Sequence, residues 1–353
     1  RSSAASDVYK RQICRMKTTK KIYVKVSIIF LLGGILLFSS CEKEENQKIE
    51  ANRKTLFMYL PWSSNLTNYF YNNISDLEKC ITKIGLNNEK VIVFISTGST
   101  EAMMFEIVSS HGRCKREILK KYKSPPFTTI DGITAILNDV KAFAPASVYT
   151  MIIGCHGMGW LPVYEMKVRS APHMKMHWEY QGVPLTRYFG GLTAEYQTDI
   201  KSLASGIANA GMKMEYILFD DCYMSSIEVA YELKDVTKYL IGSTSEMMAY
   251  GMPYAAIGEY LLGNPDYQSG CEEFYNFYST YEIMPCGTLA VTDCSELENM
   301  AAIIKSINSK YSFDKSLRGT IQRLDGYTPV IFYDFADYIT CLLYRSQSPR
   351  DTR

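Results

Sequence analysis

Short, uninterrupted runs of apolar residues recur along the chain at intervals that suit buried strands. They lie at 55–60, 91–95, 149–155 and 216–219, with further runs at 239–243 and 287–291. Apolar runs without polar alternation are typical of strands that are covered on both faces of a parallel sheet. Amphipathic stretches that fit helices lie near 65–84, 128–143, 196–210, 224–236 and 295–309. The alternation predicts an α/β fold with a mostly parallel central sheet flanked by helices.

The two ends of the chain do not follow this pattern. Residues 1–15 precede the first methionine, and residues 345–353 follow an apolar helical pattern that stops at about Tyr344. We expect both segments to be non-native extensions and the native protein to continue beyond residue 344. The folded domain is therefore predicted to span residues 54–344. Within it, the segment 161–190 lacks apolar periodicity and is expected to be an exposed loop.

The first methionine begins a segment that predicts export from the cell. Basic residues at 17, 20, 21 and 25 precede an apolar run over 26–38, which ends in Ser39, Ser40 and Cys41. The run is shorter than the roughly twenty residues that span a bilayer, so it indicates a signal peptide over 16–40. The cysteine directly after it resembles a bacterial lipobox, in which Cys41 is lipidated. An ordinary cleaved signal with an incidental cysteine is the alternative.

A polar tether follows over residues 41–53 and begins with the charged stretch 42–45. A lysine followed by acids just past the cysteine resembles the surface-export signal of lipoproteins in the Bacteroidetes, and a plain polar linker is the alternative. The lipobox resemblance implies a membrane partner. We expect the protein to be lipid-anchored to the bacterial cell envelope, in the outer membrane and exposed at the surface.

Composition and charge exclude several other classes of function. The chain has 38 Lys and Arg residues against 37 Asp and Glu residues, so no global field attracts nucleic acid. The basic run over 113–123 is interpreted as a solvated face. The glycine-rich phosphate-binding motifs G-x-x-x-x-G-K-[ST] and G-x-G-x-x-G do not occur, which argues against a nucleotide cofactor.

Metal and disulfide chemistry receive little support from the spacing of histidines and cysteines. His173 and His177 are four residues apart but lack the glutamate of a zincin motif, and the ten cysteines show no C-x-x-C spacing. We therefore predict no metal site and no cofactor. A structural or activating calcium ion would leave no readable pattern in this sequence. Pairing among Cys80, Cys114, Cys271, Cys286 and Cys294 is compatible with an oxidising compartment.

Two predicted strand ends carry side chains suited to nucleophilic catalysis. His156 follows the run 149–155 and Cys222 follows the run 216–219, and functional groups gather at the carboxyl ends of parallel strands. A helix expected from about residue 224 would favour the Cys222 thiolate, and His156 can accept and return its proton. The backbone N–H groups of Gly157 and Cys222 are candidates for an oxyanion hole. A structural role for both side chains is the alternative.

Three segments around these residues carry a resemblance to a known family. H-G-M-G-W at 156–160, D-D-C-Y-M-S-S at 220–226 and the stretch 242–254 are similar, in order and spacing, to segments of the clostripain family of cysteine peptidases. The likeness runs over about 54–293. It implies a caspase-like three-layer sandwich in which His156 and Cys222 form the catalytic dyad.

The acidic residues near the nucleophile bear on substrate preference. Asp220 and Cys222 are two residues apart and so point to the same side of an extended strand. A carboxylate there would pair with an arginine or lysine before the scissile bond, and the resemblance implies the same preference. Glu246 is a second candidate. A helix N-cap or a buried structural acid is the alternative for Asp220, and an ordinary loop residue is the alternative for Glu246.

Two functions from different classes follow. The first is a lipid-anchored cysteine endopeptidase that cuts protein or peptide substrates after Arg or Lys. The family resemblance further implies cleavage of the chain in the 161–190 loop, where Lys167, Arg169 and Lys175 are the candidate sites and an uncut loop is the alternative. The second function is a non-catalytic surface lipoprotein that uses a caspase-like fold to bind protein or glycan.

Overall fold

The described part of the chain is built from strands and helices that largely alternate. The structure, a computed structural model, describes residues 52–161, 163, 190–327 and 330–344. The strands are β1 (Asn52–Leu60), β2 (Glu89–Ser96), β3 (Glu101–Ser110), β4 (Arg113–Lys123), β5 (Ala146–Ile153), β6 (Met214–Phe219), β7 (Thr237–Gly242) and β8 (Ala290–Asp293). The α-helices are α2 (Thr67–Ile84), α3 (Ile130–Phe143), α5 (Ile200–Asn209), α6 (Ile227–Leu233), α7 (Tyr254–Leu261), α8 (Tyr267–Ser279), α9 (Leu297–Asn308) and α10 (Phe335–Tyr344).

Several predictions fall outside the described ranges. They are the two expected extensions, the signal peptide with the lipidation candidate Cys41, nearly all of the tether, and most of the 161–190 loop with Lys167, Arg169, Lys175 and the two histidines 173 and 177. Within the described ranges, no helix combines the length and apolar character needed to cross a bilayer.

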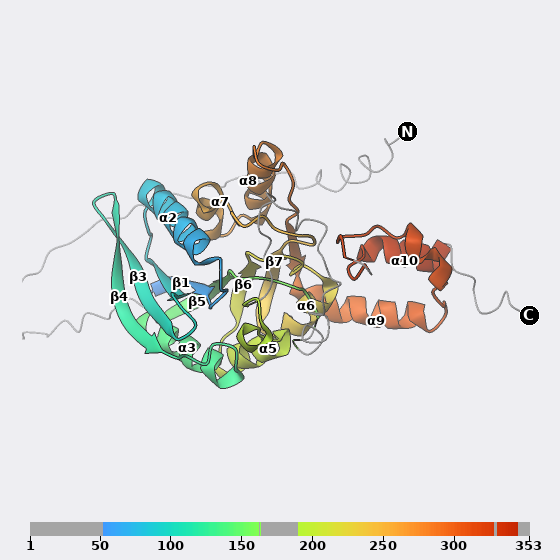
Figure 1. Cartoon of the computed structure of the whole chain (residues 1–353), viewed down its shortest axis with the longest axis horizontal. Helices are drawn as coiled ribbons and strands as arrows, with labels where there is room; N and C mark the ends of the chain where they lie inside the picture. Colours follow the sequence, from blue (N-terminus) through green and yellow to red (C-terminus); the bar gives the residue numbers. More distant parts are fainter. Residues whose placement is uncertain (1–51, 162, 164–189, 328–329, 345–353) are drawn as a thin grey trace, which may run out of the picture. The chain divides into compact units, whose positions relative to one another are not determined.

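The strands form one mixed sheet in the order β4-β3-β2-β1-β5-β6-β7-β8 (Figure 1). The five strands from β2 to β7 in this order run parallel, whereas β3, β4 and β8 are antiparallel to their neighbours. The prediction of a mostly parallel central sheet flanked by helices is confirmed. The strand expected at 287–291 is β8, which begins three residues later.

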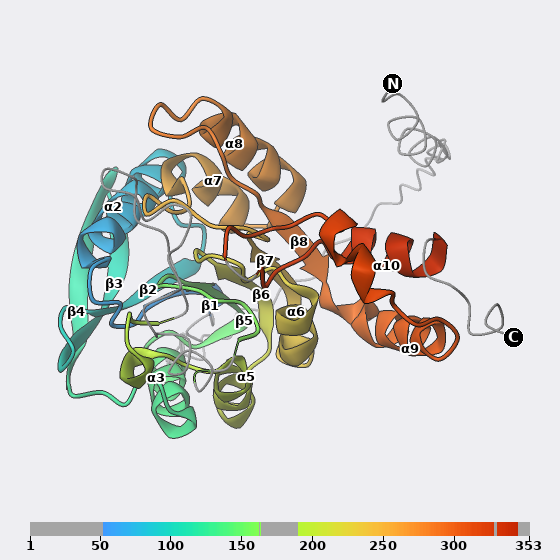
Figure 2. The same cartoon turned by 45° about the vertical axis from the view of Figure 1, so that its right-hand side comes forward.

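Helices cover both faces of the sheet, as Figures 1 and 2 show. One buried cluster joins α2, α7 and α8 to strand residues such as Leu56 and Met58. The other joins α3, α5 and α6 to Phe57 and Tyr59. Alternate residues of β1 thus point to opposite layers, because successive side chains of a strand project to opposite faces. The apolar runs in the sequence exist because the central strands are covered on both sides.

The hairpin of β3 and β4 was not predicted. The basic run 113–123, interpreted as a solvated face, is strand β4 at the edge of the sheet. Several of its side chains are exposed, while Arg116 pairs with Glu78 and Lys120 pairs with Asp139. Charged residues are common on edge strands because they discourage pairing with other chains, and they also hide the apolar signal of a strand.

Candidate active site

The two candidate catalytic residues follow neighbouring strands. β5 and β6 pair in parallel, with Ile153 opposite Phe219, and the Asp220 N–H donates to the Ile153 carbonyl at 2.8 Å. Both strands therefore end at the same level. His156 and Cys222 each lie three residues beyond a strand end, on connecting loops that leave the carboxyl edge of the sheet side by side. β5 and β6 are thus neighbours in the sheet.

Glycine at position 157 is required by the contact between these two loops. A Cβ atom placed at Gly157 would overlap the carbonyl oxygen of Cys222 and lie 2.9 Å from the Asp221 Cβ and 3.1 Å from the Cys222 nitrogen. Gly159 has φ +58°, and a Cβ there would lie 2.7 Å from the ring of Phe332 and 2.9 Å from the Tyr223 carbonyl oxygen. The glycines of the H-G-M-G-W segment thus allow its backbone to lie directly against the Cys222 turn.

Cys222 is fully buried in a tight turn rather than at the start of a helix. The helix expected from about residue 224 is α6, which begins at Ile227 with Ser226 as its N-cap. This part of the prediction is wrong, because residues 221–225 instead turn and bond to the loop after β7. A backbone group supplies what the helix does not: the Met247 N–H donates to the Cys222 sulfur at 3.2 Å. In its thiol form the same sulfur donates to the Met247 carbonyl at 3.7 Å. The N–H donor favours the thiolate.

His156 is bonded to a residue on the β1 side of β5, the side away from β6 and Cys222. The side chain is 1% exposed, and the His156 N–H donates to the Gly190 carbonyl at 3.1 Å. The imidazole Nε2 lies 2.7 Å from the Oδ1 of Asn65, which belongs to the loop between β1 and α2. Sequence reasoning missed Asn65. Its position just after an apolar strand that neighbours the histidine strand is the signal that could have found it.

Asp221 links the loop after β6 to the loop after β5 through hydrogen bonds to Cys155. Its carboxylate accepts the Cys155 N–H at 2.6 Å and the Cys155 thiol at 3.6 Å, and all of these groups are fully buried. Cys155 packs in the cluster with α3 and α5, whereas Cys222 packs in the cluster with α2 and α7. The two thiols therefore lie on opposite faces of the sheet. Cys155 is therefore a residue of the core.

Asp220 points to the same side of the sheet as Cys222. Its Oδ1 accepts the Met252 N–H at 2.8 Å and its Oδ2 accepts the Tyr254 hydroxyl at 3.0 Å, in a site where the carboxylate is 1% exposed. Donors on both oxygens stabilise a buried carboxylate in its charged form. The Asp220 carboxylate thus lies against the start of α7, two residues before the candidate nucleophile.

Glu246 lines a cavity of about 570 Å³ beside the Cys222 turn. Tyr223, the residue after Cys222, contributes another wall, and residues 323–327 and Val330 also line the cavity. Burial, and to a smaller extent the Glu246 carboxylate, raises the pKa of the Tyr223 phenol well above its usual 10.0. Tyr223 is therefore neutral at any physiological pH. The cavity offers a carboxylate and an aromatic wall next to the candidate nucleophile.

Cysteine pairing and metal binding are absent from the part of the chain that the structure describes. Among its residues, the cysteines expected to be able to pair are all free thiols, and no group of three or more His, Cys, Asp or Glu side chains is placed to hold a metal ion. Burial raises the pKa of the Cys80 and Cys294 thiols to about 11 each. These two thiols are therefore poor nucleophiles.

Comparisons with solved structures agree with this geometry. The chain is similar to a secreted C11 cysteine protease from Bacteroides thetaiotaomicron, "iotapain", at 60% identity over 83% of this chain and 81% of that chain, with a TM-score of 0.76. It is also similar to an inactive zymogen C11 protease from Parabacteroides distasonis, at 25% identity over 82% of this chain and 77% of that chain, with a TM-score of 0.67.

A more distant likeness extends the agreement in fold. A second secreted C11 cysteine protease from Bacteroides thetaiotaomicron, solved with an irreversible peptide inhibitor, shares 20% identity over 82% of this chain and 78% of that chain, with a TM-score of 0.66. A search of the curated proteins finds no match.

The sequence model of the clostripain family matches residues 58–348, which include both strand ends described above. The resemblance carried by the three sequence segments is confirmed, and so is the caspase-like α/β sandwich. A non-catalytic lipoprotein is disfavoured, since the matched family and the similar solved structure are cysteine proteases. The chain is a cysteine peptidase and belongs to the clostripain family.

Proposed function

We propose that Cys222 and His156 are the catalytic dyad of this peptidase. The observation that carries the proposal is the close packing of the two loops at adjacent strand ends, with Gly157 against the backbone of Cys222. The buried Met247 N–H on the Cys222 sulfur supports a thiolate. Functional groups of open parallel sheets gather at this carboxyl edge.

In this proposal, each residue has a defined chemical role. The Cys222 sulfur attacks the carbonyl carbon of the scissile bond after its proton has passed to His156. The N–H groups of Gly157 and Cys222 stabilise the oxyanion of the tetrahedral intermediate. His156 then returns the proton to the leaving amine, which releases the first product. Water hydrolyses the thioester that remains and regenerates the free Cys222.

We also propose a preference for arginine or lysine before the scissile bond. Two carboxylates support it: Asp220 lies two residues before the nucleophile on the same face, and Glu246 lines the cavity beside Tyr223. A charge pair with a buried carboxylate is strong because water does not screen it.

Self-processing in the 161–190 loop is a further part of the proposal. Both dyad residues are almost fully buried in the intact chain, with 0% exposure for Cys222 and 1% for His156. A peptidase that is closed before cutting and opens afterwards would give this arrangement, and the similar protein from Parabacteroides distasonis is described as an inactive zymogen. Arg169 and Lys167 are the favoured sites, followed by Lys175.

We place the protein on the cell envelope, attached through a lipid on Cys41. The support is the basic, apolar and small-residue order of residues 16–41. The similar B. thetaiotaomicron protease is described as secreted, which is compatible with export. Metabolic labelling with a radioactive fatty acid tests this point: the label should enter the wild-type protein and not the Cys41→Ala variant.

Hydrolysis of fluorogenic peptides by two dyad variants tests the central proposal. Cys222→Ala and His156→Ala should each lower kcat/KM for a peptide ending in arginine by at least about a thousandfold. Cys271→Ala and His111→Ala are matched controls, because Cys271 lies on α8 and His111 lies in the β3–β4 turn. Circular dichroism should show that all four variants fold. More than a tenth of wild-type activity in either dyad variant would contradict the assignment.

A further inference from the structure

The imidazole of His156 is hydrogen-bonded to a side chain that the proposed dyad does not include. Its Nε2 lies 2.7 Å from the Asn65 Oδ1. An amide oxygen only accepts hydrogen bonds, so Nε2 must carry the proton and donate it. In a neutral imidazole the other nitrogen, Nδ1, then holds a lone pair. The contact with Asn65 therefore selects one of the two tautomers of His156.

Sheet order explains which edge of the ring faces which partner. β5, which leads to His156, lies between β1 and β6. Asn65 follows β1, and Cys222 follows β6. Asn65 and Cys222 thus belong to loops on opposite sides of the loop that carries His156. With Nε2 bonded to Asn65, Nδ1 is the ring nitrogen left to face the nucleophile.

The backbone that carries Asn65 is fixed, although the residue itself is exposed. The preceding residue, Ser64, has φ +70°, and the Asn65 N–H donates to the Ser63 carbonyl at 2.9 Å, which closes a tight turn. A serine with positive φ is uncommon and persists where its surroundings hold it. Here Ser63 and Leu66 on either side are fully buried, and α2 begins one residue later.

The backbone of His156 is fixed as well, so its side-chain torsions are the freedom that remains. The Gly154 N–H donates to the Tyr59 carbonyl at 3.1 Å, and the His156 N–H donates to Gly190. Gly157 lies against Cys222 on the other side. A hydrogen bond at Nε2 completes the orientation of the ring, as the orienting partner of a catalytic histidine does.

We propose that Asn65 is a positioning residue for His156, which holds Nε2–H and so makes Nδ1 the atom that exchanges a proton with Cys222. The inference rests on the proposed dyad. The thiol proton moves to Nδ1, the imidazolium Nδ1–H protonates the leaving amine, and the Nε2–H stays bonded to Asn65 throughout. The Asn65 bond strengthens when the imidazolium forms, because its donor is then charged.

Kinetics of Asn65 variants give the first test. Asn65→Ala should lower kcat by about tenfold or more while KM stays within about twofold, since general acid–base catalysis contributes 10²–10⁴-fold and needs the ring in place. Asn65→Asp keeps an acceptor oxygen and should restore most of the rate. Asn68→Ala, an exposed asparagine in the first turn of α2, is the matched control and should behave as wild type.

Nitrogen NMR of the histidines gives a second test that needs no activity. The chain has four histidines, so ¹⁵N-histidine labelling yields few signals, and His156→Gln assigns the one of interest. In Cys222→Ala protein above the histidine pKa, His156 should show the Nε2–H tautomer. Adding Asn65→Ala should move the two ring nitrogen signals towards the tautomer mixture of free neutral histidine. A dominant Nδ1–H tautomer in the presence of Asn65 would overturn the inference.

The two tests separate this inference from the proposed dyad. If Cys222→Ala protein cuts peptides as well as wild type does, the dyad fails whatever the NMR shows. If Cys222→Ala is inactive while Asn65→Ala keeps wild-type kcat, the dyad stands and the role of Asn65 is wrong. A variant that loses its cooperative thermal transition is replaced in the comparison by Asn65→Ser.

Discussion

Two acidic residues near Cys222 differ in what surrounds them. Both oxygens of Asp220 accept hydrogen bonds from Met252 and Tyr254 in a closed site, whereas Glu246 lines the cavity next to Tyr223. A buried acid with fixed donors can act at the base of a specificity pocket, and an acid on a cavity wall can contact a substrate directly. Substitution of each acid therefore has a different expected outcome.

Asp220→Asn should lower kcat/KM for arginine and lysine peptides. The loss of transition-state stabilisation should be about 2–5 kcal/mol, the usual cost of losing a desolvated charge pair. Peptides with leucine before the scissile bond serve as the internal control and should change far less. Glu246→Gln should show a smaller selective loss. Unchanged cleavage after arginine in Asp220→Asn, combined with a large loss in Glu246→Gln, would transfer the specificity to Glu246.

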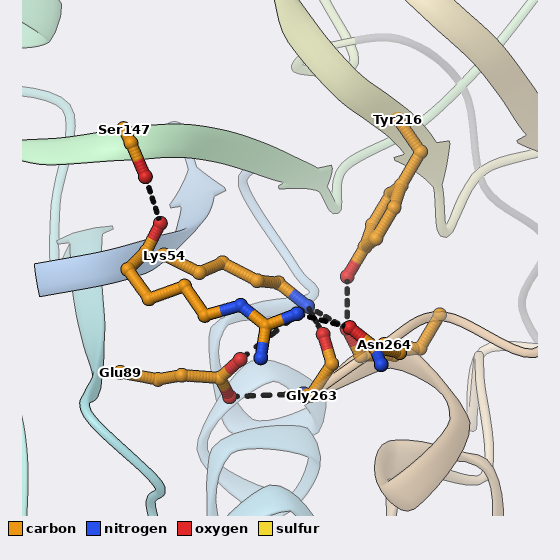
Figure 3. Close-up of polar contacts among 8 residues, drawn as sticks. Lys54, Glu89, Ser147, Tyr216, Gly263 and Asn264 are labelled. Carbon is orange, nitrogen blue, oxygen red and sulfur yellow. Dashed lines mark hydrogen bonds and ion pairs between the residues drawn. The ribbon is translucent and has the colours of Figure 1, made fainter. Parts of the chain in front are cut away.

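Lys54 is a buried lysine near the start of β1, far along that strand from the carboxyl edge of the sheet. Figure 3 shows its polar contacts. Its Nζ donates to the carbonyls of Leu261 at 2.6 Å and Gly263 at 3.1 Å and lies 4.0 Å from a Glu89 oxygen. The Tyr216 hydroxyl donates to the same Leu261 carbonyl, which joins β1 and β6 to the end of α7. Burial lowers the pKa of Lys54 below its usual 10.5, although Glu89 opposes the effect.

This lowered pKa predicts how stability depends on pH. Between the folded-state pKa and 10.5, the unfolded chain binds more protons than the folded chain, so the free energy of unfolding rises with pH. Below that window both states are protonated and the contribution is constant. Urea unfolding from pH 8 to 10.5 should show the difference between wild type and Lys54→Met growing in favour of wild type. Lys83→Met, an exposed lysine on α2, is the control, and a difference that shrinks with pH would contradict the prediction.

At the scale of elements, the segment between α9 and α10 contacts the nucleophile turn. The Phe332 ring stacks on the Tyr223 ring, with centroids 4.4 Å apart and planes 4° apart. The centroid of the Tyr327 ring lies 6.1 Å from that of Tyr223. The Asp325 carboxylate accepts hydrogen bonds from the N–H groups of Tyr327, Ile331 and Phe332. Tyr223 has φ +59°, a conformation that bulky residues rarely adopt without support.

Phe332→Ala should therefore affect catalysis as well as stability. Removal of a buried phenylalanine costs about 3–5 kcal/mol, and loss of the stacked ring frees the turn that carries Cys222. We expect kcat to fall by about tenfold or more. Phe313→Ala removes a ring that packs on Tyr338 of α10, and it should lower the melting temperature without lowering kcat. Equal kinetics in the two variants would show that the Phe332 contact is only structural.

At the scale of the whole molecule, the dyad is enclosed by segments far apart in the chain. Loops after β1, β5, β6 and β7 meet there, together with the segment before α10. Burial of a nucleophile beneath so many segments fits a precursor that needs a covalent change before it accepts substrate. Cleavage in the 161–190 loop is the change that we propose.

Intact-mass analysis of the purified protein tests this change. Wild type should be found as two fragments whose boundary follows Arg169, Lys167 or Lys175, and Cys222→Ala should stay a single chain. Replacement of all three basic residues by glutamine should slow the cut and the appearance of activity together. Self-processing is refuted by an uncut wild-type chain that is fully active, or by the same cut in Cys222→Ala.

Much of the fold could be predicted from the apolar pattern, because the central strands are buried on both faces and their residues must be apolar. The runs at 55–60, 91–95, 149–155 and 216–219 correspond to β1, β2, β5 and β6. The β3–β4 hairpin could not be predicted from this pattern, since its outer strand, β4, has only exposed and half-buried positions and carries many charges. Helices α7 and α8 were also missed. Boundaries such as the start of α6 depended on backbone hydrogen bonds to Ser243 and Ser245 in the loop after β7.

The candidate chemistry was readable where residue type and position reveal it, as for a cysteine and a histidine at the ends of buried strands. Asn65, Phe332 and the partners of Asp220 were not readable, because asparagine, phenylalanine and tyrosine occur everywhere in proteins. Asn65 lies 91 positions from His156, and the two meet only because β1 and β5 are neighbours in the sheet. Strand order brings such distant residues together, and it arises from the packing of the whole domain rather than from any local pattern.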